Sequence, residues 1–274
     1  MGNFQGKRVI SIISLTSDIG TALAERYSKR GDVVIGTYRS ENSLSKSKLT
    51  ETKGCYPFYC DISDKKSISE FVKTFRQSGL EWDTFISCPS NPLPLTSFFG
   101  GDFDEWSKSV HVNSIEQLRV LHELYPFRNK KRVSNIVYFA GGGGSNAAVV
   151  NFSAYNVAKI LLAKMCEFLD VENKDINAFI VGPGWTRTKT HKLILENVNP
   201  SDERYRITKE FLKTKKGTSM DDIFDCIEWL CEQGREVAGG RNFSVVYDKW
   251  KEGEELAREL KTDKNMFKLR RHRG

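Results

Sequence analysis

The sequence has no long apolar run and no export signal. No stretch approaches the roughly 18 consecutive apolar residues that a membrane-spanning helix requires. The N-terminus leads from Met1 to Arg8 straight into an apolar segment, without the basic start, long apolar core and cleavage site of a signal peptide. We therefore expect neither a membrane segment nor secretion.

Cysteine is not arranged for metal binding. The six cysteines, at positions 55, 60, 88, 166, 226 and 231, form no C-x-x-C pair, and His191 has no ligand set around it. Without an export signal, free thiols in a reducing compartment are expected rather than disulfides or zinc. This favours a cytoplasmic protein without a bound metal.

The chain also lacks a Pro/Gly/Ser-rich linker and an internal repeat. Its 274 residues, 39% of them hydrophobic, suit one large α/β domain with a substantial core. We expect a single domain over 1–260, with a flap at about 185–216, and a basic C-terminal tail over 261–274.

Basic residues exceed acidic ones, 42 to 35, and the excess gathers at 186–216 and in the tail. A basic patch can steer an anionic ligand, whether nucleic acid or a phosphorylated metabolite. The alternative is a solvated face balanced by local acids. No zinc-finger, RNA-binding or basic-heptad signature is present, which disfavours nucleic acid as the partner.

Short apolar segments alternate with amphipathic ones along the chain. Strands are expected at 9–14, 32–38, 55–60, 82–88, 133–140, 176–181 and 242–247, and helices at 19–28, 67–75, 104–124, 154–169 and 220–231. This alternation predicts an α/β fold, a doubly wound parallel sheet with helices on both faces. In such sheets ligands bind beyond the carboxyl ends of the strands.

Glycine is sparse where a dinucleotide-binding turn would need it. The turn after the first expected strand reads S14-L-T-S-D-I-G20, and only Gly20 remains of the three glycines that let a backbone approach a pyrophosphate. Ser14 and Asp18 take the other two places. The Asp18 carboxylate would cap the helix well but repel a diphosphate. An ordinary strand–turn–helix unit explains this segment about as well.

Taken together, several segments resemble the short-chain dehydrogenase/reductase family, over about residues 7–250. In the family's order and spacing they are the turn 14–20, C60-D61-I62, S87-C-P-S90, V112-N113-S114, Y155-x-x-x-K159 and P183-G-W-T-R-T188. The segment 239–250 is similar to the closing segment of members that act in sugar and polysaccharide metabolism. The resemblance implies a Rossmann fold, a nicotinamide cofactor and a homodimer or homotetramer.

The spacing of Tyr155 and Lys159 fits acid–base chemistry. Side chains four residues apart share one face of a helix. An ammonium beside a phenol favours the phenolate and lowers the pKa of the phenol from about 10. Such a phenol can exchange a proton with a carbinol oxygen while hydride moves at the adjacent carbon. A chance pairing on a surface helix is the alternative.

The family resemblance implies further roles. Lys159 would also hold the nicotinamide ribose, Asn113 would anchor a water in the proton relay, Asp61 would receive the adenine amino group, and Thr188 would contact the carboxamide. The cofactor-binding residues expected on this basis are Ser14, Thr16, Asp18, Ile19, Tyr38, Arg39, Ser40, Asp61, Ile62, Ser87, Tyr155, Lys159, Pro183, Gly184, Thr186 and Thr188. The alternatives are a helix irregularity satisfied by Asn113, a helix cap at Asp61 and a plain turn at 183–188.

The end of the second expected strand decides the cofactor. An acidic residue there would bind the ribose hydroxyls of NAD, but Tyr38 occupies the place and Arg39 and Ser40 follow. Arg39 and Ser40 can meet a 2′-phosphate, so NADP(H) is expected. NAD remains possible, since Arg39 could instead stack on adenine.

The family's catalytic serine is missing. The position 13 residues before Tyr155 is Gly142, within A140-G-G-G-G144. Ser145 folded back, or glycine N–H groups, are the candidates to replace the serine, and Ser153 is expected to cap the next helix. Losing one such donor typically costs on the order of 10²–10³ in rate.

We therefore expect an oxidoreductase that transfers hydride between NADP(H) and a ketone or secondary alcohol. The substrate would be anionic, and sugar-like or phosphorylated. Tyr155 would act with Lys159, Asn113 and Ser145 in catalysis. The alternative hypothesis is a catalytically impaired relative that serves as a cofactor-binding or structural partner. In the family the helices near 104–124 and 154–169 pair across a two-fold axis; Leu161, Leu162, Met165 and Phe168 suit such pairing, although core packing explains them equally.

Overall fold

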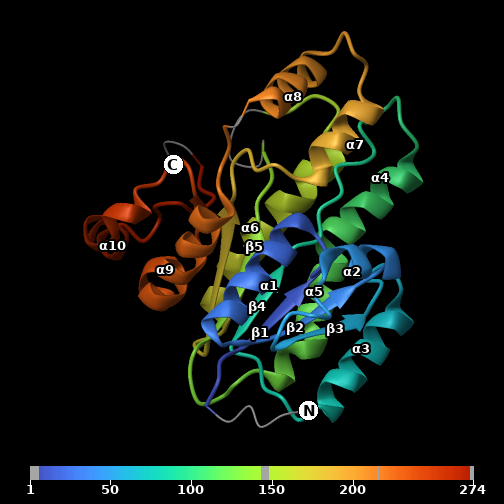
Figure 1. Ribbon diagram of the computed structural model, residues 1–274. Coiled ribbons are helices and arrows are strands. Elements are labelled where there is room, and N and C mark those ends of the chain that lie inside the picture. The colour runs from blue at the N-terminus through green and yellow to red at the C-terminus, as the bar shows by residue number, and fades with distance from the viewer. Residues whose placement is uncertain (1–5, 143–147, 215, 272–274) are drawn as a thin grey trace.

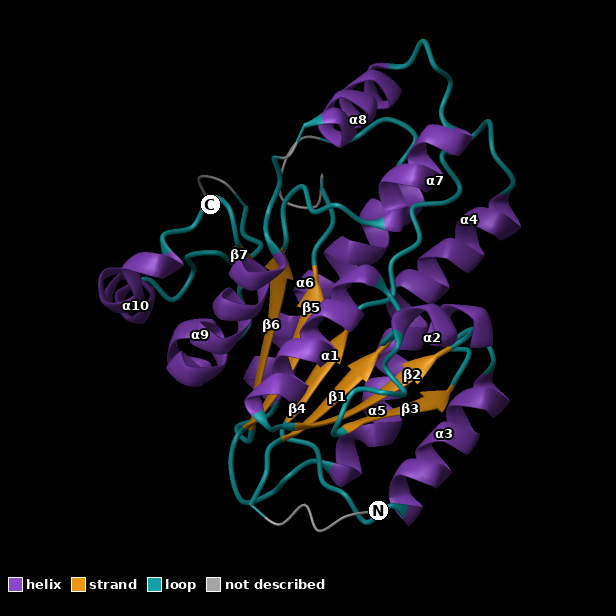
Figure 2. Ribbon diagram, viewed as in Figure 1, coloured by secondary structure: helices purple, strands orange, loops and turns teal. Residues whose placement is uncertain are grey.

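Seven parallel strands form one sheet at the centre of the protein (Figure 2). The computed structural model describes residues 6–142, 148–214 and 216–271. The strand order is β3-β2-β1-β4-β5-β6-β7. The strands are β1 (Val9–Ile13), β2 (Val33–Tyr38), β3 (Cys55–Tyr59), β4 (Thr84–Ser87), β5 (Ser134–Phe139), β6 (Ile176–Gly182) and β7 (Asn242–Ser244). The order reverses between β1 and β4, which confirms the expected doubly wound sheet and places the ligand crevice at that switch point.

Helices cover both faces of the sheet (Figure 1). They are α1 (Asp18–Arg30), α2 (Glu41–Ser47), α3 (Lys65–Gln77), α4 (Phe103–Val110), α5 (Glu116–Leu124), α6 (Ser153–Glu172), α7 (Lys189–Asn197), α8 (Glu203–Lys213), α9 (Met220–Ala238) and α10 (Gly253–Thr262). Alternate residues of β1 belong to different cores. Ile10 and Ile12 pack with α1 and α9, whereas Val9 and Ile13 pack with α3, α5 and α6. This two-sided burial explains why four of the five residues of β1 are apolar, with the buried Ser11 as the exception.

The long helix expected at 104–124 is interrupted. A π-helical turn, η1 (His111–Ile115), joins α4 to α5. Such a turn adds a residue to the helical ladder and is frequent at functional sites. Apolar periodicity continues through the turn, so the pattern alone predicts one continuous helix.

The C-terminal part also departs from the expectation. β7 ends at Ser244 rather than near Tyr247, because the Asp248 carboxylate accepts the Ser244 N–H and the chain turns there. Helix α10, which was not expected, packs on α9. The tail then returns to the sheet, where Asn242 N–H donates to Phe267 O across the outer edge of β7.

The expected flap contains α7 and α8, which lie beyond the carboxyl ends of β5 and β6 (Figure 2). A small separate core of Leu95, Phe152 and Ile194 joins this region to the body of the protein. In the described ranges, no helix has both the length and the apolarity needed to cross a membrane.

Candidate active site

A cavity of about 1450 Å³ lies over the carboxyl ends of the strands and beneath the flap. Among the residues expected to bind cofactor or substrate, those that line it are Ser14, Thr16, Asp18, Ile19, Tyr38, Arg39, Ser40, Asp61, Ile62, Tyr155, Lys159, Pro183, Gly184, Thr186 and Thr188. Ser87 and Asn113 lie behind the wall, and the Ser87 hydroxyl donates to Gln117 Oε1. Ser145 falls outside the described residues. The sequence segments thus meet in one cavity.

The turn between β1 and α1 is capped by Ser17 rather than by Asp18. Ser17 Oγ accepts the Gly20 N–H at 3.0 Å, so the expected cap at Asp18 is wrong by one residue. A Cβ at Gly20 would lie 2.5 Å from Ser14 O, which explains why this glycine remains. Ser14 itself has φ +62°, a conformation that normally favours glycine. In the described part of the chain, the N–H groups of Asp18 and Ile19 have no acceptor.

The Asp18 carboxylate joins the turn to the flap. Its Oδ2 accepts the backbone N–H of Lys189, the first residue of α7, at 2.7 Å. Lys189 Nζ lies 3.9 Å from Asp18 Oδ1. The carboxylate is therefore partly compensated by the N-terminus of α7 and by an ammonium, which offsets part of the repulsion that it would exert on a diphosphate.

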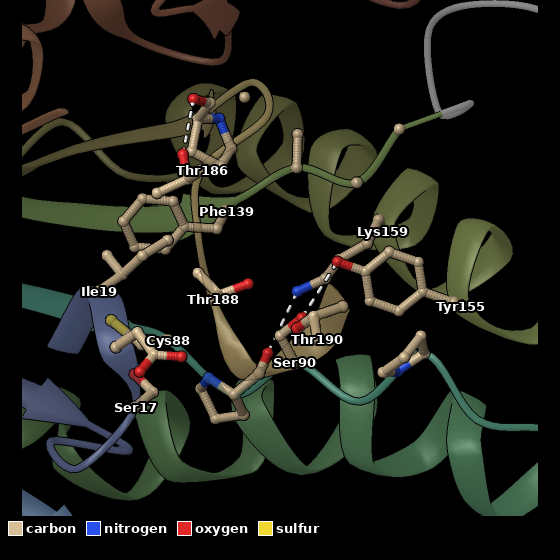
Figure 3. A pocket seen from close by; sticks show the side chains of 18 of the residues that line it. Ser17, Ile19, Cys88, Ser90, Phe139, Tyr155, Lys159, Thr186, Thr188 and Thr190 are labelled. Atoms are coloured by element: carbon tan, nitrogen blue, oxygen red, sulfur yellow. Dashed lines mark hydrogen bonds between the residues drawn. The ribbon is translucent and has the colours of Figure 1, made fainter. Parts of the chain in front are cut away.

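Tyr155 and Lys159 lie on α6 and face Ser90, which follows β4 (Figure 3). The oxygens of Ser90 Oγ and Tyr155 Oη are 3.1 Å apart. Lys159 is 2% exposed and donates from Nζ to Pro89 O at 3.3 Å. Burial lowers the pKa of Lys159 to about 8. Burial raises the pKa of Tyr155, and the hydrogen bond with Ser90 lowers it by less, so the expected net lowering by Lys159 is not found.

The surroundings of Gly141 explain why this position, in the run that stands where the family has its serine, is a glycine. A Cβ at Gly141 would lie 2.5 Å from Tyr155 Cε1 and 3.0 Å from Lys159 Cγ. A side chain at this position would displace the Tyr155 ring. At Gly142 a Cβ would meet no atom of the described residues within 4 Å. The close approach of Gly141 to the ring therefore fixes the identity of that residue.

Asn113 occupies the π-helical turn and holds the segment that follows β4. Its Oδ1 accepts the Asn91 N–H at 2.9 Å, and its Nδ2 donates to Asn91 O at 2.8 Å and to Ser109 O at 3.0 Å. The side chain is fully buried. These contacts are those of the structural alternative, in which a polar residue satisfies backbone groups at a helix irregularity.

Ser153 does not cap α6, contrary to expectation. Phe152 is the N-cap residue and makes no side-chain cap bond, while Ser153 Oγ accepts the indole N–H of Trp106 at 3.0 Å. Asp61 is likewise no cap of α3, because Asp64 has that position and the Asp61 carboxylate binds Ser63 instead. Asp61 therefore remains at the cavity wall.

An unexpected carboxylate, that of Glu41 at the start of α2, binds the last residue of β2. The Tyr38 hydroxyl donates to Glu41 Oε1 at 2.7 Å. Glu41 does not line the cavity, whereas Arg39 and Ser40 do. Arg39 is exposed and has no carboxylate partner in the described part of the chain. The approach of Glu41 was not predicted, because this residue lies three positions beyond the one that is read for cofactor choice.

Only some of the flap cations face the cavity. Lys189 and Arg204 line it, while the Arg187 guanidinium donates to backbone carbonyls at Phe211 and Leu212. Arg204 lies over the Phe152 ring, with 5.1 Å between guanidinium carbon and ring centroid. Some cations of the basic stretch thus make structural contacts, and others line the cavity.

His191 is a lining residue of another kind. It packs between the rings of Trp185 and Phe211. Its Nδ1 is buried and, in the described residues, has no partner, and burial lowers the pKa of the imidazole. The side chain is therefore neutral and aromatic in character.

Two functional features were not predicted. The Ser90 hydroxyl stood within a quoted motif, but its contact with Tyr155 depends on how β4 and α6 approach in space. The clamp between Asn113 and Asn91 likewise joins two segments that only the fold brings together.

Comparison with known proteins agrees with this architecture. The family model described as enoyl-(acyl carrier protein) reductase matches residues 14–246. The human protein "dehydrogenase/reductase SDR family member 2, mitochondrial" is 24% identical over 246 residues, covering 87% of this chain and 85% of that protein. The 3-oxoacyl-(acyl-carrier-protein) reductase FabG of Buchnera aphidicola is 23% identical over 244 residues, covering 87% and 96%.

Solved structures share the fold. The short-chain dehydrogenase/reductase YIR035C of Saccharomyces cerevisiae superimposes with a TM-score of 0.79 at 20% identity, covering 89% of this chain and 98% of that one. An actinorhodin polyketide ketoreductase with NADPH gives a TM-score of 0.77 at 19% identity, covering 89% and 97%. The family match spans most of the sequence, and the chain therefore belongs to the short-chain dehydrogenase/reductase family.

Proposed function

We propose that this protein is an NADP(H)-dependent oxidoreductase that interconverts a ketone and a secondary alcohol. Its family consists of oxidoreductases that use nicotinamide dinucleotides. The observation that carries the proposal is the placement of Tyr155 and Lys159 in one cavity with the N-terminus of α1 and with Thr188. A proton donor, a buried cation and a dinucleotide-sized crevice then share one space.

The residues of the cavity fit a dinucleotide. The free N–H groups of Asp18 and Ile19 at the start of α1 would donate to the diphosphate oxygens, with Ser14 and Thr16 beside them. Asp61 and Ile62 would hold the adenine, and Lys159 the nicotinamide ribose. Residues of the segment after β6 would flank the nicotinamide, namely Pro183, Gly184, Thr186 and Thr188. Ser87 would support this wall from behind.

Arg39 supports NADP(H) over NAD(H). Its exposed guanidinium lies at the cavity wall without a carboxylate partner in the described part of the chain, and Ser40 follows it. A guanidinium binds a phosphate through parallel hydrogen bonds. Glu41 is held by Tyr38 away from the lining, which keeps its charge from the place of the 2′-phosphate.

The chain's own residues would handle the proton. When bound, the reduced nicotinamide supplies hydride to the carbonyl carbon. Tyr155 would give its phenolic proton to the carbonyl oxygen, and the Lys159 ammonium would stabilise the phenolate that remains. The flap would exclude water, since Trp185, His191 and Phe211 form its aromatic inner packing. Alcohol oxidation reverses these steps.

Cations at the cavity favour an anionic, sugar-like or phosphorylated substrate. Arg204 lines the flap side and has no carboxylate partner among the described residues, whereas the exposed cations Lys192 and Arg206 pair with glutamates of their own helices. Arg204 is therefore the flap cation best suited to a substrate anion.

Two observations favour the alternative function, a catalytically impaired relative that binds cofactor or a partner protein. Lys159 donates to Pro89 O, and the pKa of Tyr155 is raised rather than lowered. An unreactive phenol would leave the cavity as a binding site alone.

The proposal also includes a homo-oligomeric assembly and a cytoplasmic location. Helix α6 exposes Val157, Ile160, Phe168 and Val171 on one side, which supports a homodimer or homotetramer through this face. Leu162, which we expected on that face, lies in the core. All six cysteines are free thiols, as a reducing cytoplasm would permit.

Turnover tests the proposal. Consumption of NADPH is measured with a panel of neutral, carboxylated and phosphorylated ketones, for wild type and Tyr155→Phe. We expect anionic ketones to react, and the variant to lose about 10²–10⁴ in kcat while its NADPH affinity changes little. NADPH binding without reduction of any ketone would establish the alternative function.

A further inference from the structure

The hydroxyl of Tyr155 has one side-chain partner in the described part of the chain, Ser90 (Figure 3). The Oγ–Oη distance is 3.1 Å. Two other polar side chains near Tyr155 bind other groups. Lys159 Nζ donates to Pro89 O, and the Ser153 hydroxyl accepts from Trp106. Ser90 is therefore the side chain that already binds the reacting oxygen in this structure.

The backbone on each side of Ser90 is fixed. Pro89 O accepts hydrogen bonds from Lys159 Nζ at 3.3 Å and from Gln117 Nε2 at 3.2 Å. Asn91 is held at its N–H and its carbonyl by the side chain of Asn113. The two flanking residues hold the Ser90 hydroxyl at Tyr155 before any ligand binds, which is the preorganisation that electrostatic stabilisation requires.

The opposite wall offers no hydroxyl at the described end of β5. Ala140, Gly141 and Gly142 carry none, and Gly141 has no room for a side chain beside the Tyr155 ring. A hydroxyl can reach Tyr155 from the β4 side without this clash. The glycines after β5 thus leave room for the Tyr155 ring, and the serine after β4 supplies the hydroxyl that the β5 side lacks.

We propose that Ser90 is a catalytic residue of the reaction assigned above, in which its hydroxyl donates to the phenolate oxygen of Tyr155. This inference rests on the proposed function. During ketone reduction the Tyr155 O–H bond breaks and the carbinol O–H bond forms. Hydride from reduced nicotinamide makes the new C–H bond, and the electrons of the carbonyl π bond remain on oxygen to take the proton. The negative charge left on Tyr155 Oη is then met by the Ser90 O–H and the Lys159 ammonium.

Kinetics test this role with three variants. Ser90→Ala removes the hydroxyl, Ser90→Thr keeps it, and Ser153→Ala removes a neighbouring hydroxyl that binds Trp106 instead. We expect Ser90→Ala to lower kcat about 10²-fold with little change in the KM for NADPH. We also expect the basic limb of its pH–rate profile to lie at higher pH than in wild type. Ser90→Thr should retain most activity, and Ser153→Ala all of it. Equal activity of Ser90→Ala and wild type would overturn the proposal.

A second readout needs neither cofactor nor substrate. Tyrosine labelled with ¹³C at Cζ reports phenol ionisation by NMR, and Tyr155→Phe identifies the Tyr155 signal. Over the pH range in which circular dichroism shows the folded protein, we expect Tyr155 to titrate about 1 pH unit higher in Ser90→Ala than in wild type. An unchanged titration would overturn the role of Ser90 even in an active enzyme. If the protein binds no NADPH but the shift is present, the proposed function fails while the hydrogen bond stands.

Discussion

Lys159 is enclosed by protein, with the residue 2% exposed and its ammonium hydrogen-bonded to Pro89 O. Burial disfavours the charged form and lowers its pKa from 10.5 to about 8. Below pH 8 the lysine is charged in both the folded and the unfolded protein, so folding carries the full cost of burying the charge. Between about pH 8 and 10.5 the folded protein has released this proton and the unfolded chain has not, so that cost falls as pH rises.

Replacing Lys159 by methionine should therefore stabilise the unliganded protein at neutral pH. The shift corresponds to about 3 kcal/mol, reduced by about 1 kcal/mol for the lost hydrogen bond to Pro89. Urea unfolding of Lys159→Met and wild type from pH 7 to 10.5 measures the difference, which should shrink above pH 8. Lys192→Met removes a charge from the exposed surface and serves as the control. A difference that is the same at every pH would contradict this account.

The sequence predicts the position of Tyr155 and Lys159 well, because a four-residue spacing on a helix is a local property. It does not predict the hydroxyl partner, because Ser90 and Tyr155 are 65 residues apart and meet only when β4 and α6 pack on the same side of the cavity. The raised pKa of Tyr155 was also not predictable, since it depends on burial, which outweighs the hydrogen bond with Ser90.

At the scale of elements, the sequence predicts the strands because each is a short apolar run between polar segments. It fails where tertiary contacts override a local pattern. The π-helical turn at 111–115 interrupts an unbroken helical periodicity and lets Asn113 clamp Asn91. Helix α10 carried a readable signal, since Leu256, Ala257 and Leu260 are its buried residues and are helically spaced.

The last elements are joined by one buried arginine. Arg241, immediately before β7, is 2% exposed and donates to backbone carbonyls in three places, the end of α9, the end of α10 and the tail. Through these bonds the tail stays against β7 and covers its outer edge, where Asn242 pairs with Phe267. An uncovered edge strand would invite pairing with another chain.

Arg241→Met should lower the free energy of unfolding by about 2–4 kcal/mol, because several buried carbonyls lose their donor while the volume changes little. It should also increase association of the protein. Chemical unfolding and light scattering measure the two effects, with the exposed Arg258→Met on α10 as control. Stability within about 0.5 kcal/mol of wild type would show that the tail is held by other contacts.

At the scale of the whole molecule, the sheet brings distant segments to one crevice. Each strand end contributes one feature. The N-terminus of α1 follows β1, Arg39 follows β2 and Ser90 follows β4. Gly141, which lies against the Tyr155 ring, follows β5, and the flap follows β6. These contributions come from opposite halves of the chain, so each segment taken alone is ambiguous. Their common location supports a nicotinamide site despite the altered turn and the missing serine.

Fluorescence titration with NADPH and NADH tests this central claim most directly. We expect saturable binding of wild type, tighter for NADPH than for NADH. Arg39→Ala should weaken NADPH binding about tenfold, through loss of charge-assisted hydrogen bonds, and leave NADH binding nearly unchanged. The exposed Arg258→Ala, on α10, is the matched control and should affect neither cofactor. No saturable signal with either dinucleotide would contradict the account.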